Sequence, residues 1–326
     1  MLFILTNSQD VTASYLIPAL EKGGIPFVRF DTDRVLRTAA LEFNVGHPKL
    51  RLNGCWYEPA QISHIWYRRP EEFKGEGFDD TPEAKYARGE WAEFFENFFA
   101  HVPKERWMNH PSANAAASRK LEQLSVAVQL GIKVPDTMVT QEPEKLKVFY
   151  AKHQGRLIAK PLSTGFVERG KNEADSLIYT NRLSATDLEN LDDLSVCPTL
   201  FQHFVEKDYD VRITIVDTAL TAVKLVAKES DGTQRCDIRR NNMVDVTHSP
   251  IDLPDHVASG IWKLMKKYHL RFAAIDMVVS VAGDWLFLEI NPNGQWAWID
   301  QKADTDIAGL FVRAFSSDGH NAARSR

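Results

Sequence analysis

Cysteine is scarce in this 326-residue sequence: the three cysteines are Cys55, Cys197 and Cys236, far apart and in no C-x-x-C pair. This spacing supports neither a disulfide framework nor a zinc site and indicates reduced thiols. No apolar run approaches the roughly 20 residues that cross a bilayer. The opening MLFILTNSQD is apolar for only five residues and lacks a basic start, so it predicts a strand and not a signal peptide. We therefore expect a cytoplasmic protein without a membrane partner.

An excess of basic charge is also missing. The formal net charge is −5, with 25% charged and 44% hydrophobic residues, a balance that gives no support for a nucleic-acid partner. Common phosphate-binding signatures are absent as well. The sequence has no G-x-G-x-x-G after its first strand, no G-x-x-x-x-G-K-S/T, and no H-R-D or D-F-G. These absences argue against a dinucleotide site at the first strand, a P-loop enzyme and a protein kinase.

The first part of the chain has the pattern of an α/β layer. Residues 2–5 predict a buried strand, 11–22 a helix, and 25–30 a second strand, in β-α-β order. A further helix near 83–101 carries an aromatic stripe formed by Trp91, Phe94, Phe95, Phe98 and Phe99. The stripe is favoured as core, and the alternative is a subunit interface, which would make the protein a homodimer.

The rest of the chain continues to mix strands and helices. A long helix is predicted over 112–130, with Gly131 as its end. The segments 209–216 and 219–228 predict a hairpin that turns at Asp217-Thr218. The residues after Phe315 are polar and predict a disordered tail. The length suits two or three packed subdomains.

The stretch 272–294, FAAIDMVVSVAGDWLFLEINPNG, predicts two apolar strands joined by a tight turn. If Ala282-Gly283 is a two-residue loop, Asp276 lies directly opposite Glu289. The two carboxylates would repel each other across about 5 Å, and a cation between them would remove the repulsion. Asn291, on the same face as Glu289, adds a third oxygen. Oxygen ligands favour Mg²⁺, with Mn²⁺ as the second candidate, over zinc. The alternative is a solvated acidic face, and a register slip of one residue would separate the carboxylates.

Cationic side chains occur within or beside apolar segments. Lys160, in RLIAKPL, needs an anionic partner if it is buried, or else reaches the edge of its strand. Arg212 lies two residues after Asp210, and the two could form no more than an internal salt bridge. Lys120 follows a helix-forming run and has no special signal of its own. Together with a metal site, such cations are the set that phosphoryl transfer requires.

Two pairs of arginines are further candidates for binding anions. Arg239 and Arg240 could clamp a phosphate through bidentate hydrogen bonds. Arg68 and Arg69 precede the rigid Pro70 and could hold a substrate carboxylate, with an interdomain salt bridge as the equal alternative. Strand alternation directs these two side chains to opposite faces, so we expect only one of them in a cleft.

The order of these motifs resembles that of a known superfamily. SRKLEQL around Lys120, VPDT, IAKPL around Lys160, FQHFVEKDYDVRI, AIDMVV and LEINPNG occur in the order found in ATP-grasp carboxylate–amine ligases. WYRRP, NHPSA and the ending NPNGQWAW are similar to the peptide-modifying branch, the microviridin-type or graspetide synthetases. The resemblance covers nearly the whole chain.

The resemblance implies an α/β protein with an ATP-grasp fold built from α+β subdomains. It implies an N-terminal pre-ATP-grasp α/β domain over 1–110, a central ATP-grasp subdomain over 111–205 and a C-terminal one over 206–315, followed by the tail 316–326. ATP would lie between the last two subdomains.

It also implies roles for single residues. Lys120 and Lys160 would contact the phosphates of ATP, and Asp210 its ribose. Arg212 and Arg239 would stabilise the transferred phosphoryl group and an acyl phosphate. The linker against adenine would be formed by Gln202, His203, Phe204 and Val205, and the Mg²⁺ site by Asp276, Glu289 and Asn291. Two features depart from the pattern: His203 stands where an acidic residue is common, and the loop after Lys160 is poor in glycine.

The implied reaction begins with phosphorylation of a carboxylate by ATP, because a free carboxylate has no good leaving group. A hydroxyl or amine then attacks and gives an ester or an amide. In the graspetide branch these groups belong to Asp or Glu and to Ser, Thr or Lys of a ribosomal precursor peptide with a leader and a core. Arg68, Arg69 and Arg240 are candidates for substrate contacts. Two alternatives stay open: a ligase that joins an amino acid to a small acid or a protein C-terminus, and a nucleotide-binding peptide scaffold without catalysis.

Overall fold

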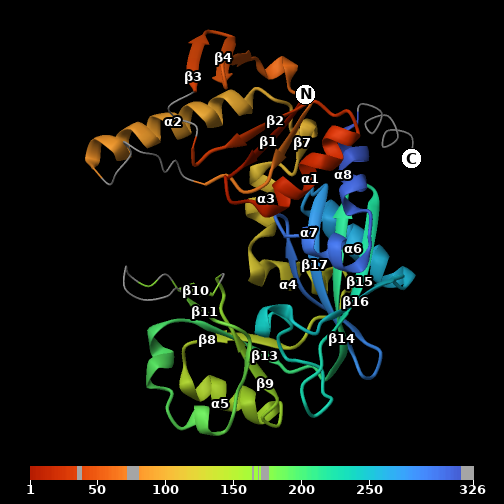
Figure 1. Ribbon diagram of the computed structural model, residues 1–326. Helices are drawn as coiled ribbons and strands as arrows, with labels where there is room; N and C mark the ends of the chain where they lie inside the picture. The colour runs from red at the N-terminus through yellow and green to blue at the C-terminus, as the bar shows by residue number, and fades with distance from the viewer. Residues whose placement is uncertain (35–38, 72–80, 164, 168, 170–175, 317–326) are drawn as a thin grey trace.

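The computed structural model describes residues 1–34, 39–71, 81–163, 165–167, 169 and 176–316. Figure 1 shows three parts along the molecule, with the N-terminal part at the top, the C-terminal sheet in the middle and the central part at the bottom. Among the described residues, no helix is long and apolar enough to cross a membrane. The predicted tail, 316–326, lies outside the described residues from 317 onward.

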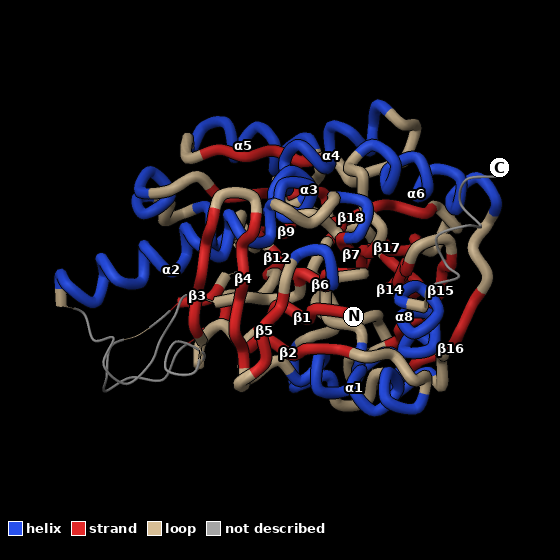
Figure 2. The backbone as a smooth tube through the Cα atoms, turned by 90° about the horizontal axis from the view of Figure 1, so that it is seen from above, coloured by secondary structure: helices blue, strands red, loops and turns tan. Residues whose placement is uncertain are grey.

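The N-terminal part contains a parallel four-stranded sheet and a smaller antiparallel one. The bounds are β1 Leu2–Thr6, α1 Val11–Lys22, β2 Phe27–Asp31, β3 Ala40–Asn44, β4 His47–Leu52, β5 Cys55–Tyr57, β6 His64–Tyr67 and β7 Trp107–Met108. The orders are β2-β1-β6-β7 and β3-β4-β5, seen from above in Figure 2. Asp10 begins α1, because its side chain accepts from the N–H groups of Thr12 and Ala13. The predicted β-α-β start is confirmed.

Helix α2, Pro82–Ala100, packs its aromatic stripe onto the N-terminal sheets. Phe95, Phe98 and Phe99 are buried, whereas Trp91 and Phe94 are half-buried against the same hydrophobic cluster. These large rings fill the space between the helix and the strands, and this burial stabilises the part. The stripe is therefore core, as favoured from the sequence.

The long helix predicted over 112–130 is two helices, α3 Pro111–Ala117 and α4 Lys120–Gln129. The hydroxyl of Ser118 donates back to the Asn114 carbonyl at 2.7 Å, a bond that bends helices. The side-chain amide of Gln123 donates to the Ala117 carbonyl at 2.6 Å, which a continuous helix would use for its own ladder. The prediction of one helix was wrong for this reason, and Lys120 consequently stands in the first turn of α4.

The central part is an antiparallel sheet of order β12-β9-β13-β8 with a helix on one face. The bounds are β8 Thr137–Thr140, α5 Pro143–Lys152, β9 Leu157–Lys160, β12 Asn181–Arg182 and β13 Thr199–His203, and a separate pair is formed by β10 Phe166–Val167 and β11 Ser176–Leu177. Leu146 and Phe149 of α5 bury themselves against Leu157 and Phe201 of the sheet. This small core fixes β9 and β13, which face the C-terminal part.

The C-terminal part is built on an antiparallel sheet of order β16-β15-β14-β17-β18. The bounds are β14 Lys207–Val216, β15 Ala219–Val226, β16 Thr247–Ile251, α6 Asp255–Lys267, β17 Phe272–Ser280, β18 Trp285–Asn291, α7 Ala297–Ala303 and α8 Ile307–Phe315. Helices α4 and α6 cover one face, and α7 and α8 cover the other together with α1. The predicted turn at Asp217-Thr218 is confirmed, since Val216 pairs with Ala219.

The turn between β17 and β18 differs from the predicted two-residue loop. Val279 pairs with Trp285, and the N–H of Ser280 donates to the Asp284 carbonyl at 2.9 Å. The loop is therefore one residue longer than Ala282-Gly283, with Gly283 in the left-handed region at φ 83°. The predicted turn was wrong, and this longer loop alone would shift the register by one residue.

A β-bulge restores the predicted pairing further along the hairpin. Met277 pairs with Phe287 and Asp276 with Glu289, so Leu288 is the extra residue on β18. The two carboxylates consequently face each other as predicted, and the site depends on this bulge.

One side chain ties the N-terminal part to the start of this hairpin. Asn109 is buried and donates to the carbonyls of Phe272 and Pro292 at 2.8 and 3.0 Å. Its oxygen accepts from the N–H groups of Arg271 and Phe272 at 2.8 and 3.0 Å. Asn109 has φ 54°, a conformation that asparagine adopts more readily than most residues.

We expect Asn109→Ala to lower the free energy of unfolding by about 2–4 kcal/mol, because several buried backbone groups lose their partner at once. Urea denaturation followed by circular dichroism measures the change. Asn44→Ala, which removes an amide bonded to Glu42 on the surface, is the control and should change stability by less than about 0.5 kcal/mol. Equal effects of the two variants would contradict the role of Asn109.

Candidate active site

A cleft of about 620 Å³ lies where the central sheet meets the C-terminal sheet. Its lining includes residues of β9 and β13 on one side and of β14, β17 and β18 on the other. The sequence-predicted residues that line it are Arg69, Lys120, Lys160, Gln202, His203, Phe204, Val205, Asp210, Arg212, Arg239, Asp276, Glu289 and Asn291. The two other candidates, Arg68 and Arg240, lie outside the lining.

Asp276 is held by an arginine from the neighbouring strand. Nη1 of Arg212 donates to both oxygens of Asp276 at 2.7 and 2.8 Å, and Nη2 donates to the Gln295 carbonyl at 3.0 Å. Arg212 and Asp276 are direct partners in the β14–β17 register. The arginine therefore neutralises Asp276, and the salt bridge with Asp210 that the sequence spacing suggested is replaced by this one.

Glu289 faces Asp276 from β18 and is held less closely. Burial raises the pKa of Glu289, and the Asp276 carboxylate raises it further, while Lys120, Lys160 and Arg212 oppose both effects. Within the described residues its ion pair is with Nζ of Lys120, at 3.9 Å. The Glu289 side chain is partly exposed to the cleft, 38% by area, and a carboxylate whose charge is only partly balanced there fits a cation bound beside it.

Asn291 completes the oxygen set at the end of β18. Its Oδ1 accepts from the N–H of Asn293 at 3.0 Å, so the side chain is fixed by the loop that it begins. This loop approaches β17 closely at Gly294, where a Cβ would lie 2.3 Å from the Cβ of Ala274. Two carboxylates and an amide oxygen are ligands that suit Mg²⁺ or Mn²⁺.

Two lysines face the acidic side chains. Nζ of Lys160 donates to Oε1 of Gln202 at 2.9 Å, and the Gln202 amide donates to Oγ1 of Thr137 at 2.9 Å. Burial lowers the pKa of Lys160, and the Glu289 carboxylate opposes this. Nζ of Lys120 donates to the Ser163 carbonyl at 3.0 Å. An amide, not a carboxylate, holds Lys160, so its charge remains available to an anion such as phosphate.

The segment 202–205 presents its backbone to the cleft. The N–H groups of His203 and Phe204 donate to the carbonyls of Asp136 and Arg156 at 2.8 and 2.9 Å. Val205 is then the linker residue whose N–H has no backbone acceptor within the described residues. The His203 ring stacks on His153 at 4.6 Å between centroids, so this departure from an acidic residue serves packing.

Asp210 of β14 is partly buried, and both its oxygens are engaged. Oδ1 accepts from Nζ of Lys207 at 2.8 Å, and Oδ2 accepts from the Gln234 amide at 3.1 Å. Burial raises the pKa of Asp210, and these two partners oppose the shift. Lys207 also lines the cleft and was not singled out from the sequence. Its spacing of three residues from Asp210 was the available signal.

Arg239 is a cation open to the cleft, whereas Arg240 is not. Nε and Nη2 of Arg239 donate to Asp237 at 3.0 and 2.7 Å, and 53% of its side chain is exposed. Nη2 of Arg240 donates to the Thr180 carbonyl at 3.2 Å and to Oδ1 of Asn181. The phosphate clamp predicted for this pair is thus reduced to Arg239.

Arg68 and Arg69 also separate, as strand alternation predicts. Arg69 lines the cleft from the N-terminal part. Arg68 is fully buried, lies 3.4 Å from Asp10, and donates to the Asn293 carbonyl in the loop after β18. Burial lowers the pKa of Arg68 to about 10. It ties the N-terminal part to the loop through a hydrogen bond to a backbone carbonyl, whereas its acidic neighbour Asp10 belongs to its own part, so the contact differs from the interdomain salt bridge considered for this pair.

The arrangement of this cleft agrees with the comparison against known families. Residues 117–315, more than half of the chain, match the model of the RimK-like ATP-grasp domain. The chain belongs to this family. It is therefore an ATP-dependent ligase, and the ATP-grasp fold with an additional N-terminal α/β part is confirmed.

Solved structures resemble this ATP-grasp ligase over nearly its whole length. Macrocyclase MdnC bound with precursor peptide MdnA, from Microcystis aeruginosa MRC, has 26% identity and a TM-score of 0.83, with 97% of this chain and 99% of that chain covered. A RiPP-associated ATP-grasp ligase of Chryseobacterium gregarium, in complex with ADP and a leader and core peptide, has 25% identity and a TM-score of 0.80, with 96% of each chain covered. Comparison with the curated proteins yields no match.

Besides Lys207, two residues that organise the ATP-grasp cleft were not predicted from the sequence. Gln123 of α4 accepts from the N–H of Ile290 at 3.1 Å and donates to its carbonyl at 2.9 Å, so it acts as a strand partner for the edge of β18. Asp237 holds Arg239. Both act through contacts between segments distant in the sequence or through loop geometry, and neither has a local signal.

We expect Glu289→Gln to lower the rate of ADP release by this ATP-grasp ligase by about 100-fold or more, because an amide cannot balance the charge of a cation. The substitution removes repulsion with Asp276, so the melting temperature should stay the same or rise. A coupled assay with Mg²⁺ and ATP measures the rate. Glu144→Gln, on an exposed pair with Lys147, is the control. An unchanged rate for Glu289→Gln would refute the metal site.

Proposed function

We propose that this ligase is a macrocyclase of the graspetide type. It would phosphorylate Asp or Glu side chains of a ribosomal precursor peptide and join them to Ser, Thr or Lys side chains of the same peptide. The likeness to a macrocyclase bound with its precursor peptide carries this proposal. It spans 97% of the chain, including the N-terminal part that lies outside the family domain 117–315.

The charges in the cleft suit the first step, in which ATP converts a carboxylate into an acyl phosphate. Lys120 and Lys160 would hold phosphate oxygens, since both ammonium groups line the cleft opposite the acidic face. Arg239, which is open to the cleft, would stabilise the charge that develops on the transferred phosphoryl group. Arg212 would act mainly by orienting Asp276, because its guanidinium is bonded there and its side chain is 11% exposed, against 53% for Arg239.

The acidic face would hold Mg²⁺, or Mn²⁺ as the second candidate. Asp276 and Glu289 would supply carboxylate oxygens and Asn291 an amide oxygen. A bound divalent ion would neutralise negative charge between phosphate oxygens during transfer. The partly balanced charge of Glu289 supports this assignment.

The other end of the cleft would take the nucleoside. The N–H of Val205, which has no backbone acceptor within the described residues, would donate to the edge of adenine, since the N–H groups of His203 and Phe204 already donate to backbone carbonyls. Lys207 and Asp210, joined at 2.8 Å, would meet the ribose hydroxyls as a pair. Asp210 alone was predicted for this role, and its two engaged oxygens favour the pair.

The precursor peptide would enter beside the N-terminal part. Arg69 is the cation that this part contributes to the cleft, so we assign it, and not Arg68 or Arg240, to a carboxylate of the core peptide. A leader segment would bind away from the reacting residues. A ligase that adds a free amino acid to a small acid or a protein C-terminus is the second candidate, because the same phosphate and metal chemistry would serve it.

Mass spectrometry separates the two candidates. The enzyme is incubated with ATP, Mg²⁺ and an acidic, Ser/Thr/Lys-containing peptide encoded beside its gene. Cyclisation removes one water, about 18 Da, for each linkage and needs no added building block. A mass gain of one residue that requires a free amino acid would refute the macrocyclase and support the second candidate.

We expect Arg69→Ala to raise KM for the peptide by about 10-fold, with KM for ATP nearly unchanged, because a lost charged hydrogen bond costs about 1.5–3 kcal/mol. Steady-state kinetics with varied peptide and with varied ATP measure both constants. Arg313→Ala, on an exposed pair with Asp306 in α8, is the matched control. A selective rise in KM for ATP would place Arg69 at the nucleotide instead.

A further inference from the structure

A segment of the C-terminal part forms hydrogen bonds with the central part. Residues 235–240 lie between β15 and β16, yet two of their side chains bond to Thr180, just before β12 of the central sheet. The N–H of Thr180 donates to Oδ2 of Asp237 at 3.2 Å, and its carbonyl accepts from Nη2 of Arg240 at 3.2 Å. We name this pair of contacts the Thr180 latch. The N–H of Thr180 is thus bonded to a negatively charged side chain, and its carbonyl to a positively charged one.

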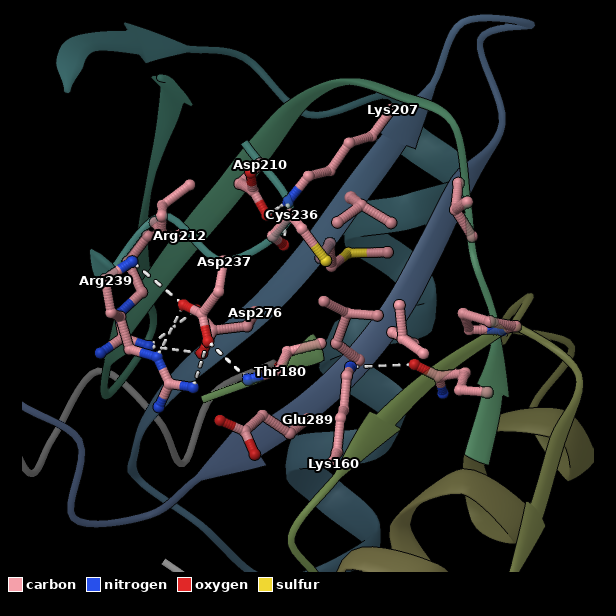
Figure 3. A pocket seen from close by; sticks show the side chains of 18 of the residues that line it. Lys160, Thr180, Lys207, Asp210, Arg212, Cys236, Asp237, Arg239, Asp276 and Glu289 are labelled. Carbon is pink, nitrogen blue, oxygen red and sulfur yellow. Dashed lines mark hydrogen bonds and ion pairs between the residues drawn. The ribbon is translucent and has the colours of Figure 1, made fainter. Parts of the chain in front are cut away.

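Asp237 carries a second set of bonds, to Arg239. Oδ2 accepts from Nη2 of Arg239 at 2.7 Å, and Oδ1 accepts from Nε and from the backbone N–H of Arg239, each at 3.0 Å (Figure 3). The Asp237 side chain is 5% exposed, whereas that of Arg239 is 53% exposed. An enclosed carboxylate therefore fixes a guanidinium that is open to the cleft.

These hydrogen bonds leave the Asp237 carboxylate no acceptor position for a substrate. A carboxylate has about four acceptor positions, and the four donors of Arg239 and Thr180 fill them. Burial raises the pKa of Asp237, but the bonds from Arg239 and Thr180 outweigh burial and hold the pKa at about 2. Asp237 is consequently charged in any ordinary assay buffer and acts only through its partners.

We propose that Asp237 is a positioning residue that aims Arg239 at the transferred phosphoryl group while the Thr180 latch is closed. The inference rests on the proposed role of Arg239 in phosphoryl transfer. If the central part moves away from the C-terminal part, Asp237 loses one of its donors and Arg240 loses its acceptor. Closure of the cleft around ATP is thereby linked to the placement of the cation, which limits hydrolysis in the open state.

Asp237→Asn tests the positioning role. This variant keeps the size of the side chain but turns an N–H group toward the donors of Thr180 and Arg239. We expect kcat for ADP release with Mg²⁺, ATP and the precursor peptide to fall by about 10–100-fold, with KM for ATP changed less than about threefold. Asp237→Glu keeps the charge and should recover part of the loss. Asp231→Asn, on an exposed carboxylate bonded to Thr233, should match the parent enzyme.

A double-mutant cycle shows whether Asp237 acts through Arg239. Arg239→Ala should itself lower kcat, and adding Asp237→Asn to it should produce little further loss. Multiplied losses in the double variant, or a parent-like kcat in Asp237→Asn, would overturn the inference. A parent-like kcat in Arg239→Ala would overturn the proposed role of Arg239 in phosphoryl transfer, which is a different result.

Arg240→Gln tests the connection across the cleft without removing a bond to Arg239. We expect kcat to fall by about 3–10-fold and the loss to be smaller in the Asp237→Asn background, because both residues belong to the Thr180 latch. Circular dichroism melting verifies that each variant is folded. An unchanged kcat with a raised KM for the peptide would make Arg240 a substrate contact and would overturn the latch.

Discussion

The repulsion between Asp276 and Glu289 is the constraint on which the rest of the cleft depends. The bulge at Leu288 places the two carboxylates opposite each other at the wall of the cleft, each with about a third of its side chain exposed (33% for Asp276 and 38% for Glu289). Arg212 balances the charge of Asp276, while Glu289 keeps a raised pKa and a distant lysine. The two facing carboxylates therefore carry more negative charge than their neighbours balance. A divalent ion bound between them and the phosphates of ATP would remove this excess.

The cationic side chains that line the cleft come from all three parts of the molecule. Lys160 belongs to the central sheet, Lys120 to the first turn of α4, and Arg69 to the N-terminal part. Their positions hold only while the parts are packed together. Asn109 and Arg68 fasten the N-terminal part to the loop after β18, and residues 235–240 join the C-terminal part to the central one. No single part carries the complete set of charged residues that lines the cleft, so the proposed catalytic roles depend on the packing between the parts.

Neutral polar side chains fix the positions of several charged residues of the cleft. Gln123 completes the edge of β18 and also bonds the last carbonyl of α3, so one amide positions both the strand of Glu289 and the helix of Lys120. Gln202 accepts directly from Lys160 without adding charge, and its own amide is held by Thr137. A neutral partner of this kind fixes the position of a cation without cancelling its positive charge, which remains available to a bound anion.

Local patterns in the sequence were enough for the α/β start, the aromatic core of α2, the hairpin at Asp217-Thr218 and the charged cleft residues Lys160, Arg212, Asp276 and Glu289, because hydrophobic periodicity and the chemistry of charged residues are local properties. The motif order was enough to indicate the family. The tertiary structure alone decided the break before Lys120, the bulge at Leu288 and the separation of Arg239 from Arg240. Each of these depends on a partner far along the chain or on a backbone irregularity. Asp276 and Glu289 face each other because two departures from regular geometry, the longer turn and the bulge, cancel.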